Sequence, residues 1–375
     1  MKIYFIANAR IPTDKAHGIH IAKMCEAFAE AGAAVTLVVP RRSAPGSLRG
    51  YYGLRTDVPV VYLPALGGLY RRGRIGFFLS SAFFMLGYFL YLLGKRLCGE
   101  KFVTYSVDMD TFSFFPLAML GTPAYVEMHT PKPSTLLTRF FFRRAHIIVT
   151  NPLIAEELAQ TFGISRDRLL VEPNGVDGLL LDAPLSKQEA RRKLGLPEDA
   201  PFALYAGRLY GWKELGILAK AARDSVLPIR LLGGTREKYE SVTGEGGGQL
   251  LFAGACPPND VPLWLAAADV LLILGSAKNE SSYRYTTPMK VYEYFAAGRP
   301  VVASATPALR SFIPEDAVAW YEPDDARSLC DAIQTAHTGG AETRQKIERG
   351  AAEALAHTWS VRAERILAFI HAYGN

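Results

Sequence analysis

Short runs of β-branched and aromatic residues alternate with helical stretches along the whole chain, in two successive series. This alternation is typical of parallel sheets whose faces are covered by helices, so it predicts an α/β fold. In the first series we expect strands at residues 3–9, 35–39, 60–63, 102–106, 124–127, 147–150 and 169–172, with a helix over 19–31. In the second series we expect strands at 202–206, 229–232, 250–252, 270–274, 301–304 and 318–321, followed by helical segments over 326–337 and 342–373.

The two series are separated by the turn-rich segment Pro173-Asn174-Gly175-Val176-Asp177 and by a charged stretch that ends at Pro201. A chain of 375 residues is long enough for two or three domains of roughly 100 to 200 residues each. We therefore expect two α/β domains of similar size. Clefts between domains are favoured ligand sites, so we expect a ligand to bind between them.

Composition and cysteine spacing exclude several other classes of protein. With 49% hydrophobic and 21% charged residues the chain can bury large cores, which excludes disordered and fibrous proteins. The cysteines are too far apart in sequence for a thiolate metal or redox motif, and we expect reduced, mostly buried thiols at Cys25, Cys98, Cys256 and Cys330. The first apolar run is soon broken by Arg10 and Asp14, unlike a secretory signal, which predicts a cytoplasmic protein.

The net charge of +6 is unevenly distributed along the sequence. Residues 1–180 contain 20 Lys and Arg against 13 Asp and Glu, whereas residues 181–375 contain 22 against 23. This asymmetry favours an anionic partner for the first half, either nucleic acid or a membrane surface, although a scattered, solvated excess of charge would give the same numbers. The arginines are dispersed and no known nucleic-acid module is present, so we expect no nucleic-acid partner.

A run of twenty residues without charge, 75–94, lies between basic flanks formed by Arg71, Arg72 and Arg74 before it and Lys95 and Arg96 after it. By length alone this segment could span a bilayer, or it could be a buried core helix. Strands are predicted both before and after it in the sequence. If the helix crossed a membrane, it could no longer cover the sheet that these strands form. We therefore favour a helix that is partly core and partly in peripheral contact with an anionic membrane, at the inner face of the plasma membrane. The aromatic residues expected at that contact are Phe77, Phe78, Phe83, Phe84, Tyr88 and Tyr91.

The strongest local motif is the segment 285–302, which predicts a helix at the carboxyl edge of the second sheet. Thr287 suits the N-cap, Pro288 suits the first helical position, and Gly298 suits the end of the helix. Lys290 in the first turn opposes the helix dipole unless an anion binds there, and free amides of Met289 and Lys290 would donate to a phosphate. Glu293 could accept hydrogen bonds from ribose hydroxyls. A plain surface ion pair between Lys290 and Glu293 is the alternative.

A second basic group follows the first strand of the second series, in Gly207-Arg208-Leu209-Tyr210-Gly211-Trp212-Lys213. Gly207 lets the backbone approach a ligand closely, and Arg208 and Lys213 can both bind the same phosphates. Together with the Lys290 helix, this segment predicts a pyrophosphate site with a ribose acceptor beside it. A nucleotide-sugar donor needs these two features.

With these motifs the sequence resembles the retaining family 4 glycosyltransferases, within the glycosyl transferases group 1, over nearly its whole length. The matching pieces are Gly207-Arg208-Leu209 with Lys213, Pro288-Met289-Lys290 with Glu293, Gly298 to Ser304, Pro173 to Asp177, and Trp359-Ser360. The resemblance implies a GT-B fold with two Rossmann-like domains facing each other across a deep cleft. It implies an acceptor-binding domain over 1–180, a donor-binding domain over 181–356, and a last helix, 357–375, that crosses back to the first domain.

The resemblance also implies roles for individual residues. Arg208 and Lys213 correspond to the diphosphate-binding pair and Glu293 to the glutamate that holds the ribose. Gly18 corresponds to the glycine of the first loop, near the donor phosphates, and His129 to the histidine that contacts the transferred sugar. His129, Arg208 and Lys213 are thus the expected catalytic residues, and the expected donor-binding residues are Gly18, Gly207, Arg208, Lys213, Thr287, Pro288, Met289, Lys290 and Glu293.

One position departs from the family pattern. The family has a first glutamate eight residues before the second, and Tyr285 stands there in this sequence. That glutamate contacts donor-sugar hydroxyls in the family, so its loss concerns the choice of sugar more than catalysis. Glu280, Arg284 or Tyr285 could take its place as sugar contacts.

We expect no metal ion and no cofactor, because Arg208, Lys213 and the helix end can offset the charge of the leaving diphosphate. Asp108-Met109-Asp110 has metal-binding spacing but lies in the other half, where acceptor contact or loop capping is expected. His17 and His20 could share a helix face, with no third ligand evident.

The function implied by the resemblance is retaining, metal-independent transfer of a sugar, of the hexosyltransferase type, from a nucleotide diphosphate sugar to a carbohydrate or lipid-linked acceptor. Envelope polysaccharide or glycolipid assembly is the expected setting. The alternatives are a nucleotide-sugar epimerase of the same fold, which would need acid and base carboxylates, and a non-catalytic scaffold with a degenerate site. The phosphate motif does not cleanly distinguish a glycosyltransferase from an epimerase. Tyr285 is the only residue that supports the hypothesis of a non-catalytic scaffold.

Overall fold

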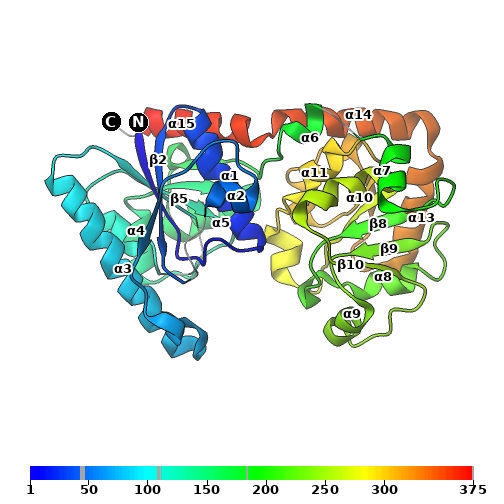
Figure 1. Cartoon of the computed structure of the whole chain (residues 1–375), viewed down its shortest axis with the longest axis horizontal. Helices are drawn as coiled ribbons and strands as arrows, with labels where there is room; N and C mark the ends of the chain where they lie inside the picture. Colours follow the sequence, from blue (N-terminus) through cyan, green and yellow to red (C-terminus); the bar gives the residue numbers. More distant parts are fainter. Residues whose placement is uncertain (43–46, 108–109, 111, 183–184, 374–375) are drawn as a thin grey trace. The chain divides into compact units, whose positions relative to one another are not determined.

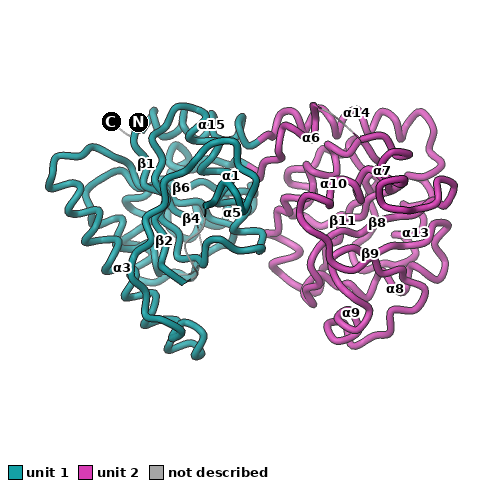
Figure 2. The backbone as a smooth tube through the Cα atoms, viewed as in Figure 1, with its two compact units in different colours: residues 1–172, 359–375 teal, residues 173–358 magenta. Residues whose placement is uncertain are grey.

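The computed structural model describes residues 1–42, 47–107, 110, 112–182 and 185–373. It divides into two compact units, which we describe separately (Figure 2). Unit 1 comprises residues 1–172 and 359–375, and unit 2 comprises residues 173–358. The boundary lies at Pro173 rather than at the predicted residue 181, because Asn174 and Val176 already bond within unit 2. The Asn174 amide donates to the Thr287 carbonyl and the Val176 amide donates to the His357 carbonyl.

Unit 1 is built on a parallel sheet of seven strands with the order β3-β2-β1-β4-β5-β6-β7 (Figure 1). The strands are β1 (Lys2–Ile6), β2 (Ala34–Pro40), β3 (Val60–Leu63), β4 (Val103–Val107), β5 (Ala124–Met128), β6 (His146–Val149) and β7 (Leu169–Val171). Its longer helices are α1 (Ala16–Glu30), α3 (Gly73–Leu97), α5 (Pro152–Phe162) and α15 (Trp359–Tyr373), and the shorter ones are α2 (Leu48–Tyr52) and α4 (Leu136–Phe142). Helix α15, from the end of the chain, packs beside α1.

Unit 2 has a parallel sheet of six strands with the order β10-β9-β8-β11-β12-β13. The strands are β8 (Ala203–Ala206), β9 (Ile229–Leu232), β10 (Leu251–Gly254), β11 (Val270–Ile273), β12 (Val301–Ser304) and β13 (Ala319–Tyr321). The helices are α6 (Leu179–Asp182), α7 (Lys187–Leu194), α8 (Gly216–Ala221), α9 (Arg236–Thr243), α10 (Val261–Ala267), α11 (Lys290–Ala296), α12 (Pro307–Arg310), α13 (Ala326–Thr338) and α14 (Gly340–Ala356). The long helical segment expected over 342–373 is interrupted at residues 357–358.

The core of unit 2 lies on both faces of its sheet, because successive side chains of a strand point to opposite faces. In β8, Leu204 and Ala206 join the cluster that includes α10, α11 and α14, while Ala203 and Tyr205 join the cluster that includes α8 and α13. Every predicted strand is present. Strands buried on both faces read as continuous apolar runs, which explains why the central strands were predicted, while the outer strands β3, β7 and β10 are only partly buried. The four cysteines are free, but only Cys25 is fully buried and Cys98 is exposed, so the expectation of mostly buried thiols is wrong.

Helix α3 has one face that packs in the core of unit 1 and an opposite face that is apolar but exposed. Its buried positions, at helical spacing, are Gly76, Ser80, Ser81, Phe84, Tyr88 and Leu92. The opposite face exposes large apolar side chains at Ile75, Phe78, Leu79, Phe83, Leu86, Leu90 and Leu97. A helix of a soluble protein usually buries its apolar face and exposes polar residues. Here the buried face includes two serines and a glycine, whereas several leucine and phenylalanine side chains on the opposite face are exposed to solvent.

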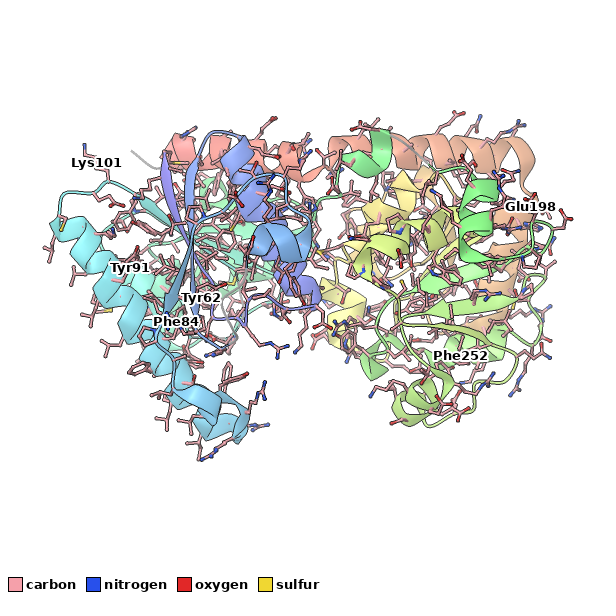
Figure 3. The ribbon with its side chains drawn as sticks, in the orientation of Figure 1. Tyr62, Phe84, Tyr91, Lys101, Glu198 and Phe252 are labelled. Carbon is pink, nitrogen blue, oxygen red and sulfur yellow. The ribbon has the colours of Figure 1, made fainter. Side chains whose placement is uncertain are left out.

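The predicted set of exposed aromatic residues on α3 is therefore partly wrong. The rings of Phe84, labelled in Figure 3, and Tyr88 are fully buried, and Phe77 and Tyr91 are half-buried. The helical period of 3.6 residues turns Phe84 and Tyr88 toward the rest of unit 1, where the Tyr88 hydroxyl donates to the Ser113 carbonyl. By length and composition α3 could cross a membrane, and it is the one such helix in the described part of the chain.

Candidate functional site

The predicted phosphate residues gather at one edge of the sheet in unit 2. The strand order reverses between β8 and β11, and open α/β sheets bind ligands outside the carboxyl ends of the strands at such a point. Gly207 directly follows β8, and the segment that follows β11 leads to α11, which carries Lys290 and Glu293. The topology therefore brings together motifs that lie about 80 residues apart in the sequence.

Lys290 is fixed at the end of β8. Its Nζ donates to the carbonyl of Ala206 at 2.6 Å and lies 4.2 Å from the centroid of the Tyr205 ring. The Tyr294 hydroxyl donates to the same carbonyl at 3.1 Å. The pKa of Lys290 lies well below its ordinary value, because burial disfavours the ammonium ion and the charge of Lys213 adds to that effect. This lysine is held in place with part of its charge uncompensated.

Lys213 supplies the second cation of this cluster. It lies in η4 (Gly211–Lys213), and burial lowers its pKa to about 8. Its Nζ is 5.1 Å from the centroid of the Trp212 ring and has no carboxylate partner among the ion pairs of the described residues. Two ammonium groups close enough to lower the pKa of one of them would both be stabilised by an anion placed between them.

Glu293 does not pair with Lys290. No ion pair links the two among the described residues, since Lys290 bonds to the Ala206 carbonyl instead. Burial raises the pKa of the Glu293 carboxyl, and the charge of Lys290 only partly offsets that effect. The alternative of a plain surface ion pair is therefore wrong. Arg208, next to Gly207, is exposed.

The backbone approaches closely at this edge because glycines end two neighbouring strands. A methyl group on Gly207 would lie 2.8 Å from Nζ of Lys290, and one on Gly233, which follows β9, would overlap the carbonyl oxygen of Gly207. Gly233 has a φ of +121°, a conformation that favours glycine. Gly233 was not among the predicted site residues, although the pair Gly233-Gly234 directly after a strand was a visible signal.

The helix of the strongest motif begins later than predicted. Helix α11 starts at Lys290, and its N-cap is Met289, whose side chain makes no capping bond. The predicted N-cap role of Thr287 and first helical position of Pro288 are therefore wrong. The Thr287 carbonyl instead accepts from Nδ2 of Asn174 at 2.7 Å, which ties this segment to the start of unit 2 ahead of the helix. Asn174 belongs to the segment Pro173 to Asp177 that was noted in the sequence, but its hydrogen bond to the segment ahead of α11 was not predicted.

The candidate sugar contacts surround a short π-helical turn, η6 (Ser281–Tyr285). Glu280 and Arg284 are exposed, whereas Tyr285 is buried. The Arg284 guanidinium lies 5.7 Å from the Tyr285 ring centroid. Their role as sugar contacts stays a prediction.

Unit 1 carries the other predicted residues. Gly18 lies in the first turn of α1 rather than in a loop before it, because α1 begins at Ala16. A methyl group on Gly18 would lie 2.5 Å from Cγ2 of Thr13 and 2.6 Å from the Tyr52 hydroxyl, so the glycine allows α1 to pack against these residues.

His129 follows β5 and joins a buried polar cluster. Its Nε2 lies 2.9 Å from Oε1 of Glu127, within hydrogen-bond distance, and its side chain is one-third exposed. Nε2 of His20 lies 3.0 Å from the same oxygen, so the fold supplies the neighbours of His20 that the sequence did not reveal. Burial lowers the pKa of His20, which favours its neutral form. Arg362 of α15 completes the cluster, with Nη2 at 2.7 Å from Oε1 of Glu127.

His20, Glu127 and His129 have the residue types of a metal site, with ligand atoms within 4.8 Å of one another. The carboxylate is already occupied, however. Its Oε1 accepts from Arg362, and its Oε2 accepts from the Tyr105 hydroxyl at 2.6 Å and from Arg362 at 3.3 Å. A guanidinium bound to both oxygens supplies the positive charge that a metal ion would supply and repels a second cation. The cluster therefore fits a metal ion poorly.

Asp110 acts as a loop cap. Its Oδ1 accepts from the amides of Phe112 and Ser113, and its Oδ2 accepts from Nδ2 of Asn8. The expectation of loop capping is confirmed for Asp110, while Asp108 and Met109 lie outside the described residues.

Similarities to known proteins agree with this architecture. Sucrose-phosphate synthase from Thermosynechococcus elongatus aligns over 99% of this chain and 98% of its own, with a TM-score of 0.74 and 19% identity. Anabaena HepE, solved in complex with UDP and glucose, aligns over 99% and 100% with a TM-score of 0.73 and 17% identity. These likenesses establish the fold class, an α/β protein of the GT-B type with two Rossmann-like domains.

Sequence similarity narrows the class. Residues 186–354, most of unit 2, match the model of the family described as Glycosyl transferases group 1, so the similarity to that group lies in this domain. D-inositol 3-phosphate glycosyltransferase from Thermomonospora curvata is 28% identical over 68% of this chain and 64% of its own length. The alignment thus spans just under two thirds of that relative. The recognised resemblance is confirmed at the level of the group, and the assignment to family 4 stays a prediction.

Proposed function

We propose that the protein transfers a sugar from a nucleotide diphosphate sugar to an acceptor hydroxyl, with unit 2 binding the donor. The observation that carries this proposal is the pair of partly buried lysines, Lys213 and Lys290, beside Gly207 at the topological switch point. The pair matches the two negative charges of a diphosphate, and Glu293 supplies a carboxyl for the ribose. Anabaena HepE, which shares the fold, was solved with UDP and with UDP-glucose.

The proposed reaction retains the anomeric configuration and needs no metal ion. The bond from the sugar C1 to the diphosphate oxygen breaks while Lys213, Lys290 and Arg208 stabilise the charge that develops on the departing diphosphate. The acceptor oxygen attacks C1 from the same face, and its proton passes to the diphosphate. In this scheme no protein nucleophile is needed, and His129 contacts the transferred sugar. A hexose is the proposed sugar.

We further propose that the acceptor is lipid-linked or lies at a membrane surface, as in polysaccharide or glycolipid assembly at the cytoplasmic face of the plasma membrane. The support is the exposed apolar face of α3, flanked by Arg71, Arg72 and Arg74 at one end and by Lys95 and Arg96 at the other. Such a helix binds in the plane of an anionic bilayer, with apolar side chains inserted and cations among the headgroups.

The donor assignment is tested by thermal shift with UDP, GDP, ADP and their common sugar conjugates, on the wild type, Lys213→Ala and the control Lys220→Ala. Lys220 is an exposed lysine of α8 that pairs with Glu245. A ligand that binds the native state raises its apparent stability. We expect one nucleotide to stabilise the wild type and Lys220→Ala but not Lys213→Ala. A wild type that no nucleotide stabilises would overturn the donor site and leave a non-catalytic scaffold as the better interpretation.

A further inference from the structure

Arg362 is a fully buried arginine of α15 with no role in the function proposed above. Its guanidinium bonds to both carboxylate oxygens of Glu127, with Nη2 at 2.7 Å from Oε1 and Nη1 at 3.3 Å from Oε2. Nη2 also donates to the carbonyl of Glu172 at 3.4 Å, and Nη1 lies 2.9 Å from Sδ of Met24. A buried charge with this many partners adopts one orientation, because each alternative leaves donors unpaired.

Glu127 connects Arg362 to His129. The same Oε1 that accepts from Arg362 lies 2.9 Å from Nε2 of His129. Burial by itself raises the pKa of Glu127, but the charge of Arg362, followed by that of His20, overrides it and holds the pKa well below its ordinary value. Glu127 is therefore a carboxylate and can only accept hydrogen bonds. Nε2 of His129 must then carry the proton of this bond, and Nδ1 of a neutral His129 ring is left as the acceptor.

The first turn of α15 supports the cluster at a second point. The Trp359 ring packs edge-on against the ring of His20, with centroids 5.4 Å apart, and His20 packs edge-on against His129 at 5.2 Å. Trp359 is the first residue of unit 1 after the chain leaves unit 2, and Glu172 is the last before the chain enters it. Arg362 thus contacts the point where the chain leaves unit 1 and, through Glu127, the histidine of the candidate site.

We propose that Arg362 is a positioning residue, which orients His129 through Glu127 so that Nδ1 of the imidazole faces the transferred sugar as a hydrogen-bond acceptor. This inference rests on the proposed function, in which His129 contacts that sugar. It assigns the C-terminal helix a part in the site of unit 1, which is incomplete without residues 359–375. If the buried ion pair only stabilised the core, the orientation and tautomer of His129 would have no effect on sugar transfer.

The kinetic test is a double-mutant cycle between Arg362→Lys and His129→Ala. A lysine keeps the charge but cannot bond to both carboxylate oxygens at once. We expect Arg362→Lys to lower kcat roughly 10- to 100-fold, as a small misplacement of a site group does, with the donor KM nearly unchanged. In the His129→Ala background the same change should lower kcat less than about threefold, since a residue that acts through another has little effect once the other is removed. Additive losses in the double variant would overturn the proposal.

Arg365→Lys is the matched control. Arg365 lies on the same helix and bonds to Oε1 of Glu172 at 3.1 Å from a half-exposed position, without contact to Glu127. We expect this variant to keep the kcat of the wild type. A loss in Arg365→Lys as large as that in Arg362→Lys would show that any disturbance of α15 lowers kcat, which would overturn a specific role of Arg362.

A measurement on the protein without substrate separates this inference from the proposed function. The imidazole nitrogens of protein labelled with ¹⁵N-histidine report which nitrogen carries the proton, and the spectrum of His129→Ala identifies the signals of His129. We expect Nε2–H with unprotonated Nδ1 in the wild type and in Arg365→Lys, and a mixture of tautomers in Arg362→Lys. A wild-type His129 that is protonated on Nδ1 overturns the inference even if Arg362→Lys fails to fold. Correct tautomers in a protein that binds no nucleotide would overturn the proposed function and leave the positioning of His129 intact.

Discussion

The exposed leucines of α3 give a quantitative prediction for membrane binding. Leu86 and Leu90 lie on the outer face of the helix with 57% and 56% of their surface exposed. Full burial of a leucine side chain stabilises by about 1.5–3 kcal/mol, so inserting the remaining halves into a bilayer contributes roughly 1–1.7 kcal/mol each. The double variant Leu86→Ser/Leu90→Ser should therefore weaken partitioning by about 2–3 kcal/mol, or roughly 30- to 150-fold.

The assay is co-sedimentation with vesicles of phosphatidylcholine, with and without phosphatidylglycerol. The control is Leu355→Ser, which alters a leucine of α14 that is 60% exposed and lies outside the proposed membrane contact. We expect the wild type and the control to bind the anionic vesicles equally and the double variant to remain in solution. The melting temperatures should be similar, because neither leucine of α3 is part of the core. Equal partitioning of all three proteins would show that the exposed face of α3 does not insert into the bilayer.

Three further predictions concern unit 2. Because the pKa of Lys213 is lowered to about 8, the affinity for a nucleoside diphosphate should fall as pH rises through 8. The stability of the free protein should rise between about pH 8 and 10.4, because the lysine of the unfolded chain still binds the proton that the folded one has lost. Titration calorimetry and melting curves at pH 7 and 9.5 test the direction of both changes. Gly233→Ala should destabilise the fold by roughly 1–3 kcal/mol, as denaturant unfolding would show, because its methyl group would overlap the Gly207 carbonyl. Asn174→Ala should weaken nucleotide binding several-fold, since it frees the Thr287 carbonyl ahead of α11, and should cost roughly 1–3 kcal/mol in stability because a buried hydrogen bond is lost; unchanged affinity in titration calorimetry would contradict this role.

The central strands of the sheets were predictable because parallel strands buried on both faces read as continuous apolar runs, and the turn residues between the strands mark their ends. The phosphate cluster was predictable for a related reason. Gly207 and Lys290 each follow a strand at the switch point of a doubly wound sheet, so the order of the strands alone brings them to one edge.

Three features depend on contacts that no local pattern encodes. Helix α11 begins at Lys290, and the Thr287 carbonyl ahead of it accepts a hydrogen bond from Asn174, 113 positions earlier. The ion pair between Glu127 and Arg362 joins residues 235 positions apart, and the sequence of α15, which carries both Arg362 and Arg365, does not indicate which carboxylate either arginine binds. On α3 an apolar residue occupies nearly every position, so hydrophobicity alone could not show that Phe84 faces inward.

The proposed function depends on the lysine pair of unit 2, which we expect to support sugar transfer from a nucleotide sugar. The direct measurement is the release of nucleoside diphosphate from the nucleotide sugar that stabilises the protein, in the presence of a bacterial lipid extract, for the wild type, Lys213→Ala and Lys220→Ala. We predict release that requires the extract and is lost only in Lys213→Ala, with the sugar recovered on an acceptor in its original anomeric configuration. Recovery of an intact nucleotide sugar, or of its epimer, from the wild type would show that the protein is not the proposed glycosyltransferase.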